Sequence, residues 1–176
     1  MKWIFLLLIT TVITMLGCTP TEKPVTSDDV LNNPEKYASE EEDMNLKPGE
    51  WLTDWDQALS MAKKLNHPIL VDFTGSDWCI WCQKLEGEVF SKDKFKDYAK
   101  SNLILLKLDF PRSIPQTDEV KKANQEKMKE FNVEGYPTVV LLNTEGKEIA
   151  RTGYVPGGAE KYVLHLQDLL KQATIK

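Results

Sequence analysis

The chain has few of the residues that build metal centres, and it has no excess of positive charge. Its 176 residues include three cysteines and two histidines, His67 and His165, so a four-ligand zinc site would need nearly all of them together. The formal net charge is -5, and the lysines alternate with acids instead of forming a basic patch that could neutralise phosphates. We therefore expect no metal, no cofactor and no nucleic-acid partner.

Long apolar runs are also missing, apart from one at the N-terminus. Lys2 precedes an apolar run over residues 3–16, which is shorter than the roughly 20 residues that cross a bilayer as a helix. A short apolar run behind a basic residue is typical of an export signal rather than of an uncleaved anchor. We expect residues 1–17 to be a signal peptide and the protein to be exported.

The end of this run favours a lipid anchor. Residues 15–18, Met-Leu-Gly-Cys, resemble the lipobox of bacterial lipoproteins, in which the cysteine becomes the lipidated first residue of the mature chain. Met15 stands where that pattern usually has leucine. The resemblance implies that Cys18 is lipidated and holds the protein in the cell envelope, on the periplasmic or extracytoplasmic side of a membrane. The alternative is an ordinary signal peptide with an incidental Cys18.

Residues 18–50 have the composition of a flexible, acidic tether. They contain four of the nine prolines, the acidic run at residues 40–43 and few large apolar side chains. Such a segment cannot bury enough surface to offset its ordering entropy. The remaining residues, 51–176, have the size of one ordinary domain.

Apolar periodicity in residues 51–176 switches between helical and strand-like spacing. The predicted order is helix, strand, helix, strand, helix, strand, strand, helix. Strand, helix and strand with a right-handed crossover make a parallel pair, and the turn at Glu145-Gly146 joins the last two strands as a hairpin. The expected class is α/β, with a central mixed sheet sandwiched by helices. The predicted elements cover residues 55–65, 69–73, 81–99, 103–109, 118–131, 137–142, 148–152 and 159–172.

Cys79 and Cys82 stand one helical turn apart, shortly after the predicted strand at residues 69–73. Half of a zinc site would need a second pair of ligands, which is missing. As a structural staple the pair closes a short loop, worth about 2 kcal/mol in the chain-entropy model against about 3 kcal/mol for fifteen residues. Two buried thiols are a further alternative, but a strand-to-helix turn favours exposure of Cys79.

A redox role uses the same position. At the start of a helix the backbone N–H groups are unpaired, and together with the helix dipole they favour a thiolate at Cys79. The dipole alone, worth about 0.3–1 kcal/mol, would leave much of Cys79 protonated at neutral pH, so hydrogen bonds from the turn and from the Cys82 thiol must add to it. Cys82 lies one turn deeper on the same helix face, where it can resolve a mixed disulfide at Cys79.

Residues 51–176 resemble the thioredoxin family at four separated places. Their order and spacing make the resemblance more specific than a lone Cys-x-x-Cys, and it is greatest to exported, disulfide-isomerase-like members with a Trp-Cys-x-Trp-Cys motif. The resemblance implies a thioredoxin-like fold and a redox-active disulfide between Cys79 and Cys82. The four places are residues 71–73 with residues 78–82, residues 106–109, residues 133–138 and residues 146–153.

Four further residues gain supporting roles. Asp72 interrupts an apolar strand, where burial raises the pKa of a carboxyl group, so we expect it to accept the proton of Cys82; the alternative is an Asp72 that faces solvent. Lys107 interrupts the next strand, and the family pairs this position with Asp72. The resemblance implies a cis Tyr136-Pro137 bond that faces the cysteines and leaves the Tyr136 backbone free to pair with a substrate segment. A plain strand-opening proline is the alternative.

Trp78 precedes the first cysteine as in the family motif, but three features depart from the family pattern. The spacing from Asp72 to the first cysteine is one residue longer. Ile80 and Trp81 replace the usual Gly-Pro pair, which makes the surface beside the first cysteine more apolar. Residues 110–124 are longer than in the minimal family, and we assign them no function.

We therefore expect an exported, lipid-anchored thiol-disulfide oxidoreductase that acts as a monomer on cysteines of other exported proteins. Family members that oxidise strongly have a histidine between the cysteines, and none lies there in this chain, so the resemblance implies reductase or isomerase activity. Sustained reduction outside the cytoplasm needs electrons, so a membrane thiol donor is an implied partner. The alternative is a non-catalytic thioredoxin-fold module that holds a metal or a client protein at the membrane.

Overall fold

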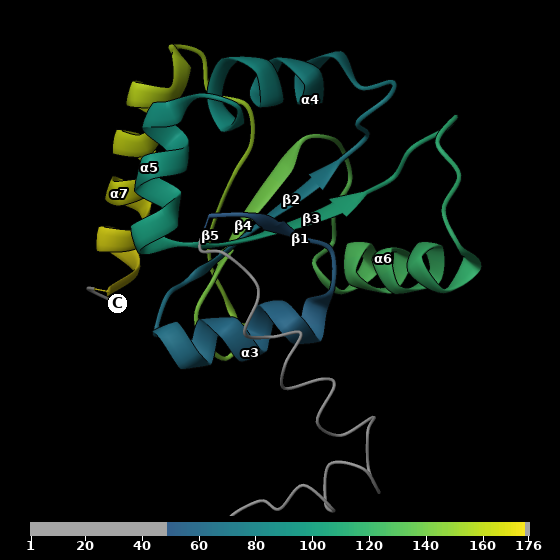
Figure 1. The fold of residues 1–176 in the computed structure, drawn as a ribbon, viewed down its shortest axis with the longest axis horizontal. Coiled ribbons are helices and arrows are strands. Elements are labelled where there is room, and N and C mark those ends of the chain that lie inside the picture. Colours follow the sequence, from purple (N-terminus) through teal and green to yellow (C-terminus); the bar gives the residue numbers. More distant parts are fainter. Residues whose placement is uncertain (1–48, 175–176) are drawn as a thin grey trace, which may run out of the picture. The chain divides into compact units, whose positions relative to one another are not determined.

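The computed structural model describes residues 49–174, and the predicted signal peptide, Cys18 and residues 18–48 of the predicted tether lie outside the described residues. The described chain forms helices, a short π-helical segment and strands (Figure 1). Among these residues no helix has the length and apolar character needed to cross a membrane. In chain order the elements are β1 (Trp51–Leu52), α3 (Trp55–Leu65), β2 (Ile69–Thr74), α4 (Ile80–Leu85), η1 (Glu86–Phe90), α5 (Asp93–Asn102), β3 (Ile104–Asp109), α6 (Asp118–Glu130), β4 (Thr138–Leu142), β5 (Glu148–Thr152) and α7 (Gly158–Thr174).

The strands form one mixed sheet in the order β1-β3-β2-β4-β5. β2 lies parallel to β3 and antiparallel to β4, which forms a hairpin with β5. These pairings confirm the predicted parallel pair, the hairpin and the mixed sheet. Sequence periodicity does not predict β1, because a strand of two residues is too short to show it. β1 pairs parallel with Leu105 and Leu106 of β3.

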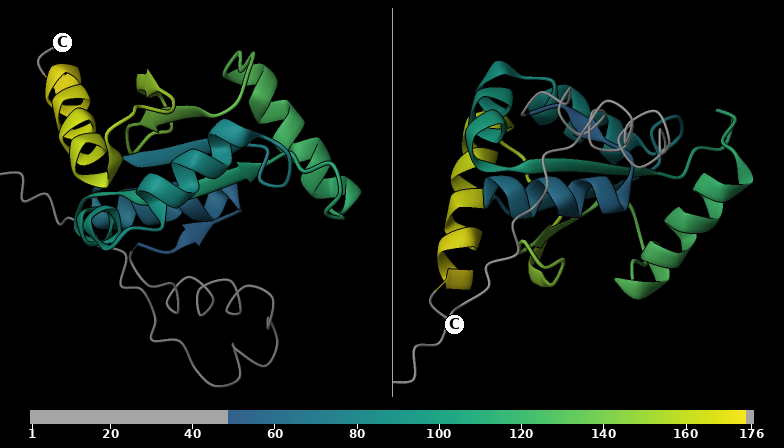
Figure 2. Two further views of the ribbon diagram at one scale, coloured as in Figure 1. Left: turned by 90° about the horizontal axis from the view of Figure 1, so that it is seen from above. Right: turned by 60° about the horizontal axis from the view of Figure 1, so that its bottom comes forward.

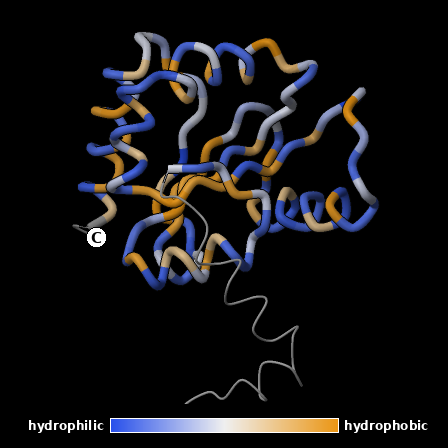
Figure 3. Tube along the Cα trace, in the orientation of Figure 1, coloured by the Kyte–Doolittle hydropathy of each residue, from blue (hydrophilic) through white to orange (hydrophobic). Residues whose placement is uncertain are grey.

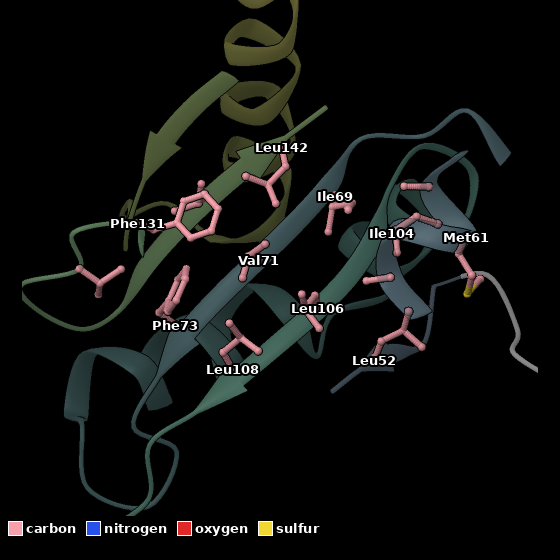
Figure 4. Close-up of a cluster of buried hydrophobic side chains, with 14 residues drawn as sticks. Leu52, Met61, Ile69, Val71, Phe73, Ile104, Leu106, Leu108, Phe131 and Leu142 are labelled. Carbon is pink, nitrogen blue, oxygen red and sulfur yellow. The ribbon is translucent and has the colours of Figure 1, made fainter. Parts of the chain in front are cut away.

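Two apolar cores cover the two faces of the sheet, because successive strand residues point to opposite faces. Val71 and Phe73 of β2 pack with α3 and with Phe131, just after α6 (Figure 4). Leu70, on the other face, packs with residues of α4, η1, α5 and α7. Helices therefore lie on both sides of the sheet, as predicted (Figure 2), and the central strands are coloured as hydrophobic in Figure 3.

The caps of α3 decide where the chain enters β2. The Asp54 carboxylate accepts the Gln57 N–H at 2.8 Å, which satisfies an N–H group of the first turn. Asn66 takes the left-handed conformation, with φ 53°, and its N–H donates to the Ala62 carbonyl. Asparagine tolerates this conformation better than most residues, so the helix ends there and the chain turns into β2.

The single helix predicted over residues 81–99 is wrong. α4 passes into η1, where the Ser91 N–H donates to the Glu86 carbonyl at 2.9 Å, and the chain leaves the helical path before α5 begins. This break lets Phe90 and Phe95 face the same core, with ring centroids 4.8 Å apart. Residues five apart on a continuous α-helix would point to different faces, so packing of these two rings requires the break.

The core on the α3 side of the sheet gives a test of stability. Leu106 of β3 is fully buried there (Figure 4). Leu106→Ala should lower the free energy of unfolding by about 2–5 kcal/mol, because apolar contacts are lost and a cavity remains. Urea unfolding of the oxidised protein measures the change. The matched control is Leu164→Ala, at an exposed position of α7, with an expected change below about 0.5 kcal/mol; equal losses at the two positions would contradict this core.

Candidate active site

The cysteine motif lies where β2 passes into α4. β2 ends at Thr74, a turn follows, and Cys79 is the N-cap residue of α4. The Cys79 N–H donates to the Gly75 carbonyl at 2.9 Å, which closes the turn. The Cys82 N–H donates to the Cys79 sulfur at 3.2 Å, so the sulfur takes one of the N–H groups that a helix leaves unpaired in its first turn. The predicted position of Cys79 at a helix start is confirmed.

Cys79 and Cys82 are joined by a disulfide, and their Cα atoms lie 5.2 Å apart. Only 6% of Cys79 and 4% of Cys82 is exposed, so the expectation of an exposed first cysteine is wrong for this oxidised state. The reason is that the Cys79 sulfur is held against Cys82 and the first turn of the helix. Ile80 and Trp81, between the cysteines, are 69% and 54% exposed and form the outer surface of the motif.

The end of β3 and the residues after it hold the turn in place. Ser76 donates from its N–H and its hydroxyl to the Asp109 carboxylate, at 2.9 and 2.6 Å. The Trp78 indole N–H donates to the Phe110 carbonyl at 2.9 Å. A Cβ atom at Gly75 would lie 2.5 Å from the Trp78 ring, so only glycine leaves room for the ring to pack there.

Asp77 connects the same turn to the loop after β3. Its carboxylate accepts the Arg112 N–H, at 3.0 and 3.1 Å to its two oxygens, and the Ser113 N–H at 2.6 Å. The hydrogen bond from Arg112 is the largest of the causes that lower the pKa of Asp77, so the carboxylate stays ionised. The Arg112 guanidinium carbon lies 3.9 Å from the centroid of the Trp78 ring.

Two departures from the thioredoxin pattern therefore meet at Asp77. One is the extra residue between Asp72 and Cys79, and the other is the long segment that begins at Phe110. Sequence reasoning missed the contact between them, because a hydrogen bond across 35 residues leaves no periodic signal. The one visible signal was an acidic residue two positions before the first cysteine.

The Tyr136-Pro137 peptide bond is cis, as the family resemblance implies. The Tyr136 ring meets the edge of the Trp78 ring, with centroids 5.7 Å apart, and packs on Phe110 at 5.3 Å. The Tyr136 hydroxyl donates to the Met128 sulfur at 3.2 Å. The fold thus brings the segment before Pro137 against the turn that carries the first cysteine.

Asp72 is buried on the face of the sheet that α4 covers. It is 3% exposed and shares its face of β2 with Leu70, so the predicted burial is confirmed. Its Oδ1 atom has no hydrogen-bond partner within residues 49–174. Burial is the largest cause that raises the pKa of Asp72, to about 7. The charge of Lys107 lowers this pKa, and the carboxylates of Glu86 and Asp109 raise it.

Lys107 lies beside Asp72 in the register of β2 and β3, but its ammonium group bonds elsewhere. The Lys107 nitrogen lies 2.9 Å from a Glu86 carboxylate oxygen and 4.9 Å from the centroid of the Trp51 ring. The expected pair of Lys107 with Asp72 is therefore replaced by a pair with Glu86, because η1 brings that carboxylate within reach of the ammonium group. Sequence reasoning missed Glu86, whose only signal is its position four residues after Cys82.

The cysteine pair and Asp72 together allow disulfide exchange and proton transfer at one site. A disulfide lies at a helix N-terminus, and a buried carboxyl group with a pKa near neutral pH lies on the strand before it. In the described part of the chain, no group of three or more His, Cys, Asp or Glu side chains could share a metal ion. A strand, a turn and a helix capped by the first of two paired cysteines define a disulfide-exchange site of the thioredoxin-like class.

Known proteins share both this sequence and this fold. The family model for a thioredoxin-like domain matches residues 55–168. Disulfide bond reductase DsbH of Chlamydia pneumoniae is 38% identical over 115 residues, which are 65% of this chain and 69% of that protein. Thiol:disulfide interchange protein DsbD of Klebsiella pneumoniae is 30% identical over 120 residues, which are 66% of this chain but only 18% of DsbD. The solved structure of a DsbH oxidoreductase is 37% identical, with a TM-score of 0.66 over 69% of this chain and 84% of that one.

The chain therefore belongs to the thioredoxin-like family, and it is a thiol-disulfide oxidoreductase by class. The predicted α/β thioredoxin-like fold and the predicted class of enzyme are confirmed. The finer expectation of a disulfide-isomerase-like member stays a prediction, since DsbH is a reductase by name.

The raised pKa of Asp72 makes the stability of the protein depend on pH. The unfolded chain ionises this group near its ordinary pKa of 3.8, and the folded chain does so near 7. Between these values the folded state holds the proton more tightly, so the contribution of Asp72 to stability falls as the pH rises from about 4 to about 7. A difference of about three pKa units corresponds to roughly 4 kcal/mol.

Asp72→Asn should remove this loss. The free energy of unfolding should rise by up to roughly 4 kcal/mol at about pH 8 and change little at about pH 4, because the carboxyl group is neutral in both states at low pH. Urea unfolding of the oxidised protein across this range measures the effect. Asp168→Asn, at an exposed position of α7, is the matched control. The same pH-dependent gain at Asp168 would show that the effect does not come from burial of Asp72.

Proposed function

We propose that the chain is an extracytoplasmic thiol-disulfide reductase that passes two electrons from a Cys79–Cys82 dithiol to disulfides of other exported proteins. The observation that carries this proposal is the disulfide at the N-terminus of α4, where a backbone N–H bonds the Cys79 sulfur. The match to a disulfide bond reductase over 69% of its length supports the direction of electron flow. A histidine between the cysteines would stabilise the reduced form and favour oxidation of clients. Its absence from this motif therefore also supports the proposed direction.

In the reduced protein Cys79 attacks as a thiolate. Its sulfur bonds one sulfur of the client disulfide, the client S–S bond breaks, and the other client sulfur leaves as a thiolate that takes a proton from water. The product is a mixed disulfide between Cys79 and the client. The Cys82 N–H and the N-terminus of α4 place partial positive charge at the attacking sulfur, which favours its ionised form.

Cys82 then completes the transfer. It loses its proton, attacks the Cys79 sulfur and releases the second client thiol, which leaves the disulfide between the two cysteines. We assign the role of proton acceptor to Asp72, whose pKa of about 7 and unpaired Oδ1 suit it to hold a proton at neutral pH. Leu70, on the same face of β2 as Asp72, packs in one core with Leu85 of α4, so the carboxyl group faces the helix that carries Cys82.

The other predicted site residues support this chemistry. Burial is the main cause that raises the pKa of Asp72, and the paired charges of Lys107 and Glu86 shift it in opposite directions. Trp78 positions the turn through its hydrogen bond to the loop after β3. The segment of Tyr136 and Pro137, which packs against Trp78, is where we expect an extended client segment to pair.

Each cycle leaves the protein oxidised, so another thiol must return two electrons to it. We propose that a membrane thiol donor supplies them and that the protein acts as a monomer. We also propose that Cys18, outside the described residues, carries a lipid that holds the domain at the membrane through residues 18–50. The lipobox-like residues 15–18 and the acidic, proline-rich composition of the tether support this arrangement.

Removal of either active-site sulfur should stop turnover at a different step. Cys79→Ser should reduce insulin with dithiothreitol no faster than dithiothreitol alone, because the attacking sulfur is gone. Cys82→Ser protein that is reduced and then freed of dithiothreitol should still attack a client disulfide but stall, so that a client complex accumulates on a non-reducing gel. Cys18→Ser is the matched control and should keep the full rate. A wild-type rate in the Cys79→Ser protein would remove the reductase function and favour the client-binding module.

The lipid anchor has its own test. In cells that process lipoproteins, Cys18→Ser should move the protein from the membrane fraction to the soluble fraction, because the acylated residue is lost. Immunoblots of the two fractions measure the change, with Cys79→Ser as a control that should stay at the membrane. Equal membrane association of both variants would rule out an anchor at Cys18.

A further inference from the structure

Arg112 lies beside the active-site turn with its side-chain donors unused. Its guanidinium carbon lies 3.9 Å from the centroid of the Trp78 ring, and Trp78 directly precedes Cys79. The side chain is exposed, and within residues 49–174 its guanidinium group forms no hydrogen bond or ion pair. A guanidinium group has five N–H donors in one plane, which suit a carboxylate in a bidentate pair. Arg112 therefore presents a binding group for an acceptor on the ring of the residue that precedes the first cysteine.

Asp77 holds the backbone of Arg112 at this place. Its carboxylate accepts the N–H groups of Arg112 and Ser113, at 2.6 to 3.1 Å. The carboxylate thus contacts the backbone of Arg112. The Trp78 ring is fixed in turn by its hydrogen bond to the Phe110 carbonyl. Both the backbone of Arg112 and the ring under its side chain are thus tied to the turn.

A second cation lies at the same motif. The Lys84 nitrogen lies 5.0 Å from the centroid of the exposed Trp81 ring. The Glu88 carboxylate on this side accepts the Tyr154 hydroxyl, and the Asp77 carboxylate accepts backbone N–H groups. The two cations are exposed, whereas these two carboxylates are engaged by donors of the protein itself.

We propose that Arg112 selects clients in which an acidic residue flanks the reactive cysteine, and that Asp77 positions Arg112 for this contact. The inference rests on the proposed reductase function and adds the class of client segment. Charge complementarity carries it, since the exposed guanidinium group over the Trp78 ring gains an ion-pair partner when the client carries a carboxylate beside its reactive cysteine. Lys84 adds to the same preference from the side of Trp81.

Cysteine peptides joined to thionitrobenzoate test the proposal, with Glu, Gln or Lys on both sides of the cysteine. The Cys79 thiolate attacks the peptide sulfur, the S–S bond of the peptide breaks, and coloured thionitrobenzoate leaves as a thiolate. Cys82 loses its proton, attacks the Cys79 sulfur and releases the peptide thiol. The rate for each peptide is divided by its rate with β-mercaptoethanol, which removes differences in intrinsic reactivity among the peptides.

The reduced full-length protein should react about three- to tenfold faster with the Glu peptide than with the Gln peptide at low salt, and the ratio should shrink at high salt. Arg112→Gln should remove most of the preference, leave only the part that Lys84 contributes, and keep the rate with the Gln peptide. Arg112→Lys should keep part of the preference, because the charge stays and the planar fork is lost. Lys64→Gln is the matched control and should keep the full ratio, because Lys64 precedes the start of β2 and Cys79 follows its end.

Asp77→Ala tests whether Asp77 acts by positioning Arg112 or only through its own negative charge. Loss of an anion near the site would by itself favour the Glu peptide, whereas loss of the hydrogen bonds to the loop would release Arg112 and lower the ratio. We expect the lower ratio, and a raised ratio would overturn the role of Asp77; if this variant does not fold, the Arg112 variants decide alone. A ratio near one in the wild type, or one that Arg112→Gln leaves unchanged, would overturn the selection by charge. No release from any peptide would instead overturn the reductase function itself.

Discussion

The sulfur of Cys79 caps the first turn of α4, and the rest of the site depends on this contact. A helix start leaves backbone N–H groups unpaired, and the Cys82 N–H meets the sulfur at 3.2 Å. The same turn of helix sets Cys82 close enough to close a disulfide with Cys79. The position of Cys79 at the helix start therefore stabilises its sulfur electrostatically, and it also places the Cys82 sulfur within bonding distance.

Two carboxylates hold this cap in place from opposite directions. Asp109, at the end of β3, accepts donors of Ser76 in the turn, and Asp77, in the turn, accepts donors of the loop after β3. Each carboxylate is satisfied by the other segment, so neither segment can shift without loss of hydrogen bonds in both. Trp78 adds a further bond to the same loop at Phe110. The turn is thus positioned by the end of β3 and the loop after it, in addition to its own hydrogen bond at Gly75.

Asp72 lies on the sheet face that α4 covers, where burial of its carboxyl group lowers stability at neutral pH but suits proton transfer. Burial makes its ionisation unfavourable and raises its pKa to about 7, so the fold loses stability as the pH rises from about 4 to about 7, but the site gains a proton acceptor suited to neutral conditions. The charge of Lys107 lowers the pKa of Asp72, but its ammonium group forms an ion pair with Glu86. The break that forms η1 brings Glu86 within reach of Lys107, so a local irregularity of the helix bears on the pKa of the site.

The sequence by itself determined strands β2 to β5, the cysteine pair and the burial of Asp72, because continuous apolar runs, a Cys-x-x-Cys spacing and a lone acid within such a run are local patterns. It also indicated the cis bond at Pro137, through a resemblance to a family. It did not reveal β1, the helix break at Ser91, the partner of Lys107 or the contacts of Asp77. Only the tertiary structure decided these, because packing of Phe90 against Phe95 and hydrogen bonds between distant segments depend on which elements meet in space, and no periodic pattern in the chain encodes that.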